Sequence, residues 1–507
     1  MEKVLISQLT NFKGKEVRLS GWLTNKRSGK GLEFLIIRDG SGFIQCIVDE
    51  TKVNDADFQI AKSLTQESSV SLVGQVVKDE KQIGGFEIHV SKLELLHESK
   101  GYPITNKPHG VEFLMDNRHL WLRSKRQWAI MRVRNRIIFA IHNFFQGEGF
   151  VQMDSPVFTG NAVEGTTTLF ETTYYEDKAY LTQSGQLYGE AMAMAMGKIY
   201  TFGPTFRAEK SKTRRHLSEF WMIEPEMAFY DNDMNMDLIE RFIKYILKDV
   251  KANCISELEV LERDTSIFDK IIEGTFPRLT YDYAVDVLKG KEKINGKTTI
   301  ETLENDYKEV LLEIENKQNQ ILEAEAEIKQ GVKKGKQNFL QNKIDTLKND
   351  IKELEDRKRV IPEWINSANS FEYGSDLGGS DETVLTRMFD LPLMVYNWPH
   401  EVKAFYMKRD DKNKNLAKGV DVLAPEGYGE IVGGGERETN EDLLIQKIEE
   451  HQLPMKAFEW YLDLRRFGSV PHAGFGLGLE RMVAWVCKLK HIRETIPFPR
   501  MYGRLFP

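Results

Sequence analysis

The sequence predicts an α+β protein made of a small five-stranded β-barrel, a large domain of mixed strands and helices, and an inserted helical hairpin. Three observations support this prediction. The chain has 507 residues, whereas one hydrophobic core seldom organises more than about 250–300. The first hundred residues form short runs of alternating polar and apolar residues. Residues 290–360 change to a helical apolar spacing within a background rich in Lys and Glu.

The composition excludes several classes of protein. No stretch approaches the roughly 20 apolar residues of a membrane helix, and Met1–Lys15 contains no apolar export signal, so we expect a cytoplasmic protein without membrane contact. Cys46, Cys254 and Cys487 lie far apart, which argues against a disulfide framework or a thiolate metal site. Because 70 basic residues face 77 acidic ones, any nucleic acid must be bound by a local basic surface.

Residues 1–100 are expected to form the barrel. Turns rich in glycine separate its strands, which are Val17–Thr24, Glu33–Asp39, Phe43–Val48, Ser69–Lys78 and Phe86–Leu96. Basic residues between Lys13 and Arg38 are interleaved with Phe34 and precede Gln45. This composition is typical of an OB-fold that stacks and hydrogen-bonds single-stranded bases. The alternative, a solvated barrel face with Phe34 in the core, fits this segment equally well.

Residues 101–124 follow as a candidate linker, because Gly101–Met115 contains Pro103, Pro108 and two glycines. The large α+β domain is expected over residues 125–507. A helical apolar period runs from Lys125 to Gly147, and β-branched and aromatic runs then alternate with short helical segments.

Residues 290–360 are expected to form an antiparallel coiled-coil hairpin inserted into the large domain. Proline is absent from this segment, and Gly331 and Gly335 supply a turn between two apolar runs. The two runs share a three-four spacing and comprise Ile300, Leu303, Tyr307, Val310, Ile314, Ile321, Ala324 and Ile328, then Leu340, Ile344, Leu347, Ile351 and Leu354. We expect a solvated arm without catalytic chemistry.

The first segment with candidate chemistry runs from Tyr200 to Phe220. Arg207 and Glu209 are two residues apart in a stretch with strand character. On a strand they project from the same face, so a cation and a carboxylate share one surface.

The second segment reads PHAGFGLGLER and ends at Arg481. Its glycines at 474, 476 and 478 alternate along a predicted strand, which leaves one face bare enough for a flat ring. Glu480 and Arg481 then open an apolar helix, so we expect the guanidinium at the mouth of that surface, available for stacking or phosphate contact.

Together these segments resemble the class II aminoacyl-tRNA synthetases, in the subgroup that contains the aspartyl, asparaginyl and lysyl enzymes. Gly149–Pro156 resembles motif 1 of that class, Phe206-Arg-Ala-Glu209 through Phe220 resembles motif 2, and Gly476-Leu-Gly-Leu-Glu-Arg481 resembles motif 3. The resemblance covers nearly the whole chain and leaves out only the coiled-coil segment. It implies the class II catalytic domain, an antiparallel sheet flanked by helices, and a homodimer formed through the Gly149–Pro156 region.

The resemblance also implies that ATP activates an amino acid, which is then transferred to the 3′ end of a tRNA. Two anions must meet in such a site, and Arg207 resembles the catalytic residue that bridges the substrate carboxylate and the α-phosphate. The other residues that the resemblance assigns to ATP are Glu209 at the adenine amino group, Phe220 and the second catalytic candidate Arg481 on either side of the ring, Arg215 and His216 at the distal phosphates, Gly478 and Glu430. Asp421 and Glu430 resemble the family's ligands for Mg²⁺, a hard cation that prefers oxygen.

Charge decides which amino acid the resemblance favours. Aspartyl enzymes resemble QSPQLxK, with a lysine beside the second carboxylate of the substrate, whereas this chain has Gly189 at that position. Glu224, in a stretch similar to the asparaginyl pattern, is expected to accept a hydrogen bond from a side-chain amide and to repel aspartate. Arg437 is expected to hold the side-chain oxygen. L-asparagine and tRNA(Asn) are therefore the expected substrates, and an aspartyl enzyme, including one that charges both tRNAs, is the alternative.

Two features complete the predicted amino-acid and tRNA sites. By the same resemblance Glu164, Ser184 and Gln186 hold the α-amino group of the substrate. In the barrel, the resemblance implies that Phe34 stacks the central anticodon base and that Gln45, eleven positions later, hydrogen-bonds it.

Arg27 is expected to contact anticodon phosphates or the first base. Phe34 and Gln45 cannot discriminate the tRNA for asparagine from the tRNA for aspartate, because the two tRNAs share two anticodon bases. Two other kinds of protein remain: a non-catalytic RNA-binding paralogue, which would lack motif residues, and a tRNA-independent amide-forming ligase, which would lack the barrel.

Overall fold

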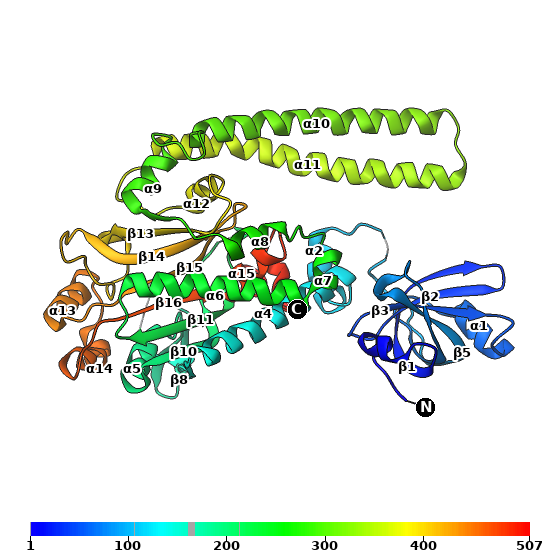
Figure 1. Cartoon of the computed structure of the whole chain (residues 1–507), viewed down its shortest axis with the longest axis horizontal. Helices are drawn as coiled ribbons and strands as arrows, with labels where there is room; N and C mark the ends of the chain where they lie inside the picture. The colour runs from blue at the N-terminus through cyan, green and yellow to red at the C-terminus, as the bar shows by residue number, and fades with distance from the viewer. Residues whose placement is uncertain (1, 106, 161–167, 212) are drawn as a thin grey trace. The chain divides into compact units, whose positions relative to one another are not determined.

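The computed structural model describes residues 2–105, 107–160, 168–211 and 213–507. The chain divides into two compact units, one ending at Ser124 and the other spanning Lys125–Phe506. Figure 1 shows the elements of both.

The first unit contains a closed five-stranded barrel with the strand order β1-β2-β3-β5-β4. Its strands are β1 (Glu16–Gly29), β2 (Leu32–Arg38), β3 (Phe43–Asp49), β4 (Ser69–Lys78) and β5 (Phe86–His97), with α1 (Asp55–Ser63) between β3 and β4. Alternate residues point inward, so Leu35 and Ile37 are fully buried, whereas Phe34 is half-buried outside the barrel core. The predicted OB-fold barrel is confirmed, and the alternative that placed Phe34 in the core is wrong.

Residues 101–124 hold two short helices, α2 (Val111–Asp116) and α3 (Arg118–Trp121). The side chain of Arg118 is fully buried, and its guanidinium lies 4.8 Å from the ring centre of Trp121. The segment predicted as a linker is therefore partly helical and packed.

The second unit is built on an eight-stranded sheet with the order β12-β13-β14-β15-β16-β11-β10-β6. Within the described residues of this sheet, only the two outermost pairs, β6 with β10 and β12 with β13, are parallel. The strands are β6 (Val151–Gln152), β10 (Lys198–Phe206), β11 (Glu219–Ala228), β12 (Arg278–Thr280), β13 (Leu393–Pro399), β14 (Leu416–Ala424), β15 (Gly429–Glu436) and β16 (His472–Gly478). A smaller sheet joins β7 (Phe158–Thr159), β8 (Glu171–Tyr174) and β9 (Asp177–Leu181).

Two long helices cover one face of the large sheet. The helix α4 (Lys125–Gly147) coincides with the predicted helix, and it packs beside α6 (Asn232–Asn253) (Figure 1). Their apolar stripes meet the inward residues of the strands in one core, where the ring of Phe145 packs against those of Tyr200 and Phe242. Apart from the inserted hairpin, the other α-helices in the described part of the unit are α5 (Gln186–Met196), α7 (Ile255–Val260), α8 (Ser266–Glu273), α9 (Tyr281–Leu288), α12 (Gly379–Thr386), α13 (Glu441–Glu450), α14 (Met455–Arg466) and α15 (Leu479–Val486).

The inserted hairpin is confirmed as a long antiparallel helix pair, α10 (Thr299–Lys329) and α11 (Lys334–Ser370) (Figure 1). Thr298 caps α10 with a reciprocal capping box to Glu301. Lys317, which interrupts the apolar spacing, forms an ion pair of 2.8 Å with Asp350 on the other helix. Gly331 turns the chain with a φ of +83°, whereas Gly335 lies inside α11.

The helix α11 continues to Ser370, past the predicted end at residue 360 and through Pro362. Apolar residues keep the helical period beyond the proline, and Ile361 and Ala368 are fully buried against α9 and α12. The free energy gained by burying these apolar residues outweighs the loss of the backbone hydrogen bond that Pro362 cannot donate. None of the helices in the described ranges is long and apolar enough to cross a membrane.

Candidate active site

The central strands of the large sheet have two chemically different faces. On β11, β14 and β16 the residues Ile223, Val422 and Leu477 point to the apolar core beneath α4 and α6. The residues between them point the other way and line a cavity of about 830 Å³. Because side chains alternate along a strand, the sheet that builds the core also presents polar groups on its opposite side.

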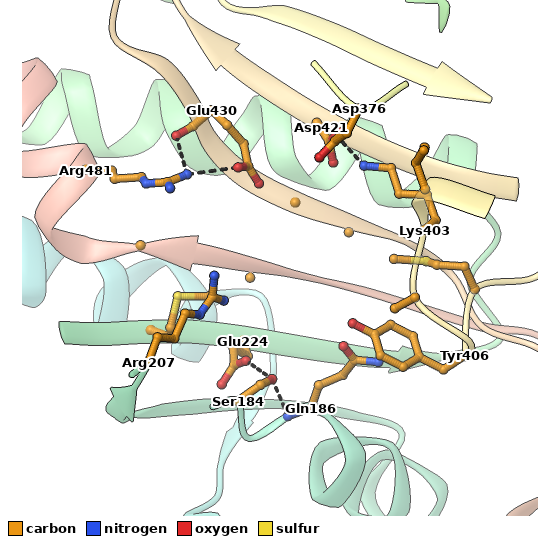
Figure 2. A pocket seen from close by; sticks show the side chains of 18 of the residues that line it. Ser184, Gln186, Arg207, Glu224, Asp376, Lys403, Tyr406, Asp421, Glu430 and Arg481 are labelled. Carbon is orange, nitrogen blue, oxygen red and sulfur yellow. Dashed lines mark hydrogen bonds and ion pairs between the residues drawn. The ribbon is translucent and has the colours of Figure 1, made fainter. Parts of the chain in front are cut away.

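This cavity gathers the residues that the motifs predict (Figure 2). The predicted residues that line it are Ser184, Gln186, Arg207, Glu209, Arg215, His216, Phe220, Glu224, Asp421, Glu430, Arg437, Gly478 and Arg481. Arg207 and Arg481, which are 274 positions apart in the numbering, therefore share one cavity. The remaining residue predicted for this site, Glu164, lies outside the described residues.

Arg207 stands at the point where the motif 2 segment leaves the sheet. The strand β10 ends at Phe206, so the prediction that Arg207 and Glu209 lie on a strand is wrong. The backbone N–H of Arg207 still donates to the carbonyl of Ser218 at 3.0 Å, and its guanidinium lies 5.3 Å from the ring centre of Phe220. This contact holds a positive charge over the cavity.

Arg481 is positioned by the first turn of α15. The preceding Glu480 is buried, accepts from the guanidinium of Arg134 on α4 at 2.7 Å and accepts from the backbone N–H of Trp221 at 2.9 Å. Arg481 itself donates to both the backbone carbonyl and the carboxylate of Glu430 at 2.9 Å. The motif 3 glutamate thus fixes the helix, and the helix places the neighbouring guanidinium, a planar fork of several donors, at the cavity wall.

The predicted phosphate-contacting residues differ in where they lie. His216 lies 3.5 Å from Glu209, and burial lowers the pKa of its imidazole, which favours the neutral ring. Arg215 donates to Glu382 at 3.0 Å and Thr383 at 2.6 Å on α12, and to the carbonyl of Gly427, between β14 and β15, at 2.6 Å. Its guanidinium is therefore engaged at one wall of the cavity.

Two carboxylates form the candidate metal site. A Cβ built on Gly433 lies 2.8 Å from a carboxylate oxygen of Glu430 and 3.5 Å from one of Asp421, so both acids converge above this glycine. Burial alone would raise the pKa of Glu430, but Arg481 and Lys403 outweigh it and lower the pKa.

No cluster of three or more potential ligands exists among the described residues. Mg²⁺ commonly takes one or two carboxylates and completes its shell with water and phosphate oxygens, so a pair of acids fits this ion.

The amino-acid end of the cavity is organised by Glu224. It accepts from the Ser184 hydroxyl and from the backbone N–H of Gly185 at 2.7 Å. The Ser184 oxygen in turn accepts from the backbone N–H of Gln186 at 3.1 Å (Figure 2). Glu224 therefore lies with the residues predicted to hold the α-amino group.

The barrel brings its three predicted residues to one area. Arg27 and Phe34 face each other across β1 and β2, and the guanidinium lies 4.8 Å from the ring centre. Gln45 on β3 pairs with Ile36, two residues from Phe34, so both side chains project from the same face. Gln45 donates to Glu87 at 3.1 Å.

Family comparisons agree with this arrangement. Residues 110–502 match the family model described as "tRNA synthetases class II (D, K and N)", and residues 17–96 match the one described as "OB-fold nucleic acid binding domain". This chain belongs to the class II tRNA synthetases of the D, K and N group.

Several relatives of this synthetase are similar over its full length. A protein of Sorangium cellulosum named asparagine–tRNA ligase is 48% identical over 505 residues, 99% of each chain. One of the same name from Symbiobacterium thermophilum is 45% identical over 100% of both chains. The asparaginyl-tRNA synthetase of Pyrococcus horikoshii, solved with asparaginyl-adenylate, is 37% identical, covers 100% of both chains and has a TM-score of 0.81.

The synthetase contains a second buried acid that the motifs did not single out. Glu226 is fully buried and forms an ion pair with Arg437 at 2.5 Å. A Cβ added to Gly189 would lie 3.2 Å from the side chain of Glu226. The position that carries lysine in aspartyl enzymes therefore adjoins Glu226 here. One signal was available: Glu226 is two residues after Glu224 on a strand and so shares its face.

Burial raises the pKa of Glu226 to about 7, with a contribution from nearby Glu190, although Arg437 opposes the shift. Glu190 is also buried, and Arg465, Tyr461 and His472 all contact its carboxylate. The negative charge of Glu190 also stabilises the nearby Arg437 guanidinium, whose hydrogen-bonded partner is Glu226. Lys403 was missed as well; it lines the cavity and pairs with Asp421 (Figure 2).

The glycines of motif 3 leave less open surface than the sequence predicts. A Cβ on Gly474 would lie 2.3 Å from the Glu226 carboxyl group, and one on Gly476 would lie 2.6 Å from the methyl carbon of Met222. Neighbouring side chains already cover both positions. Of the three, Gly478 alone has ordinary space around it, with its nearest atom at 3.7 Å.

Gly474→Ala is therefore expected to lower the free energy of unfolding by about 1–3 kcal/mol, because the new methyl group displaces a buried carboxylate from Arg437. Gly478→Ala is the matched control and should change it by less than about 0.5 kcal/mol. Urea unfolding followed by circular dichroism measures both. Equal stability of the two variants would contradict the packing described for Gly474.

Proposed function

We propose that this synthetase activates L-asparagine with ATP and transfers it to tRNA(Asn). The full-length similarity to proteins named asparagine–tRNA ligase supports this function. The single structural observation that carries it is the joint presence of Arg207, Arg481 and Arg437 at one cavity, with the buried Glu226 paired to Arg437 and adjoining Gly189.

The first reaction joins two anions. A carboxylate oxygen of asparagine forms a bond to the α-phosphorus of ATP while the bond from that phosphorus to the bridging oxygen breaks and pyrophosphate leaves. Arg207 offsets the repulsion between the reactants and the charge that develops on the phosphoryl oxygens. Phe220 and Arg481 hold the adenine ring between them, and Glu209 accepts from its amino group. The substrate itself is the nucleophile, so no protein nucleophile is needed.

Asp421 and Glu430 are the proposed Mg²⁺ ligands. When bound, the ion supplies positive charge to the phosphate oxygens of ATP. Arg481 pairs with Glu430 and lowers the pKa of its carboxylate, whereas burial raises the pKa of Asp421 to about 7 although Lys403 pairs with it. His216 and Arg215 complete the phosphate end; Arg215 must exchange its partners on α12 for phosphate oxygens.

Asparagine is selected at the side-chain end of the cavity. Arg437 is the proposed donor to the side-chain oxygen, and Gly189 leaves no lysine to neutralise an aspartate carboxylate. Glu226, beside both, disfavours a negatively charged side chain. Glu224 was predicted to accept a hydrogen bond from the side-chain amide of the substrate. Its contacts with Ser184 and Gly185 instead favour a position near the α-amino group of the substrate.

The second reaction transfers asparagine to the 3′ end of tRNA(Asn) and releases AMP. Phe34 and Gln45 project from one face of the barrel, which supports their proposed contact with the anticodon, and Arg27 adds charge for its phosphates. Each stacked base contributes about 1–3 kcal/mol to binding.

We also propose a homodimer through the motif 1 region. Exposed apolar side chains gather around it: Phe139 on α4 is 50% exposed, and Val151 and Phe158 are 44% and 51% exposed. Single exposed apolar residues are ordinary, but three around one motif fit an interface.

Amino-acid-dependent exchange of pyrophosphate into ATP tests the activation step. We expect exchange with asparagine, and Arg207→Ala should reduce kcat/KM by roughly 10²–10³-fold, as the loss of one transition-state donor does elsewhere. Arg214→Ala, an exposed arginine of the same loop outside the cavity, is the control and should exchange normally. Faster exchange with aspartate than with asparagine would contradict the proposed substrate.

A second experiment separates the roles of Glu226 and Glu224. Glu226→Gln removes a negative charge beside the side-chain subsite, so the preference for asparagine over aspartate in kcat/KM should fall at least about tenfold. Glu224→Gln should lower exchange with both amino acids alike.

The preference of the unaltered protein should rise between pH 6 and pH 8, because Glu226, with a pKa of about 7, becomes charged and repels aspartate. In Glu226→Gln this rise should be absent. A normal pH dependence in that variant would assign the discrimination to another group.

Light scattering after gel filtration tests the dimer. Phe139→Asp places a charge in the proposed interface and should convert the dimer to monomer. Leu312→Asp changes an apolar residue of α10 that is 60% exposed and should leave the mass unchanged. A dimer that persists in Phe139→Asp would exclude α4 from the interface.

A further inference from the structure

The far end of the hairpin has a different charge from the rest of the arm. Residues 328–344, here called the basic tip, contain five lysines and no acidic residue. Residues 299–327 of the same hairpin contain nine acidic residues and two basic ones. The lysines of the tip are all exposed: Lys329, Lys333, Lys334, Lys336 and Lys343. Positive charge is thus concentrated where the arm ends.

An exposed aromatic ring lies among these lysines. Phe339 is 66% exposed, although the next residue, Leu340, is buried in the seam between the helices. Lys336 and Lys343 stand three residues before and four residues after Phe339, so the three side chains follow one face of α11. The ring is outside the apolar cluster that holds the distal part of the hairpin together. Packing of the arm therefore does not explain it.

Exposed lysines beside an exposed aromatic ring are typical of a surface that binds RNA. Lysines neutralise phosphates and release counterions, and an exposed aromatic ring stacks on an unpaired base. Amide side chains at Gln337, Asn338 and Gln341 on the same helix add donors and acceptors for base edges or sugars. An acidic protein partner would match the lysines but gives no reason for a solvent-exposed ring among them.

We infer that the basic tip is an RNA-binding surface that contacts the tRNA during charging. This inference rests on the proposed function, which makes tRNA a substrate of the chain. It gives the arm a partner: phosphates of the tRNA at the lysines and an unpaired base at Phe339. Lys336 also pairs with Glu327 across the hairpin, so the lysines available for phosphate are chiefly the other four.

Filter binding of a tRNA(Asn) transcript to the full chain at several salt concentrations tests this inference. The variant Lys333→Gln/Lys334→Gln/Lys343→Gln should bind at least about tenfold more weakly near 0.1 M salt, and the slope of log Kd against log salt should fall by about 0.7–0.9 for each phosphate that the variant no longer neutralises. Phe339→Ser should weaken binding at least about fivefold with little change in slope.

The matched control is Lys308→Gln/Lys348→Gln/Lys352→Gln, which removes the same charge from exposed positions elsewhere on the hairpin. It should bind tRNA like the unaltered protein. Equal binding by the tip variant and the unaltered protein would overturn the inference. Equally weakened binding in the tip and control variants would overturn it too, since that result would reflect net charge alone.

Crosslinking from a photoreactive phenylalanine analogue at position 339 gives an independent readout. A crosslink to the tRNA supports the inference; a crosslink only to protein, or none to tRNA, overturns it. Pyrophosphate exchange with asparagine needs no tRNA and should be the same in every tip variant. Its absence from the unaltered protein would defeat the proposed function, whereas normal exchange with unchanged tRNA binding would defeat only the role of the tip.

Discussion

The two faces of the central strands are the constraint on which the active site depends. Along β11, β14 and β16, one set of alternate residues is apolar and buried beneath α4 and α6, and the other set lines the cavity. The core fixes the strands, and the strands fix the spacing of the polar groups opposite. Residues distant in sequence, such as Glu224, Asp421 and Gly478, therefore converge on the strands themselves.

The site also depends on a group of buried charged residues. Arg437, Glu226 and Glu190 are fully or almost fully buried, as are the partners of Glu190. Burying ions costs free energy that their mutual attraction only partly offsets. The benefit is rigidity: Arg437 has one orientation because Glu226 fixes it from behind. A substrate that differs from another by a single charge can be distinguished only in such a preorganised environment.

Much of the fold follows from local sequence patterns. The barrel strands and α4 were predicted to within a few residues, except that β1 extends to Gly29, because alternation and helical spacing dominate there. The hairpin was predictable because a packed seam between two helices requires regular apolar spacing. Its true end at Ser370 was not, since Pro362 is tolerated only through burial against the rest of the domain.

The motifs also predicted the members of the cavity but not their contacts. Which of Glu224 and Glu226 adjoins Arg437 depends on strand register, and the space beside Gly474 is filled by the side chain of Glu226 from the neighbouring strand. Arg215 was expected near phosphate, and its contacts with α12 depend on a helix that lies more than 160 residues away in the chain. A short motif predicts which residues face the ligand, but not which residues of the protein contact them from the other side.

The hairpin is held by two separate apolar clusters. Residues near its base, among them Leu303 and Ile361, belong to the core shared with α9 and α12, whereas Ile321, Leu340 and Ile344 form a distal cluster of their own. The two helices run antiparallel, so both join the domain at the base of the hairpin. Adding or removing whole turns in the distal part would change the length of the arm by about 5.4 Å for each turn and would leave the sheet intact. The length of the arm therefore sets how far its tip lies from the domain, without changing the packing at its base.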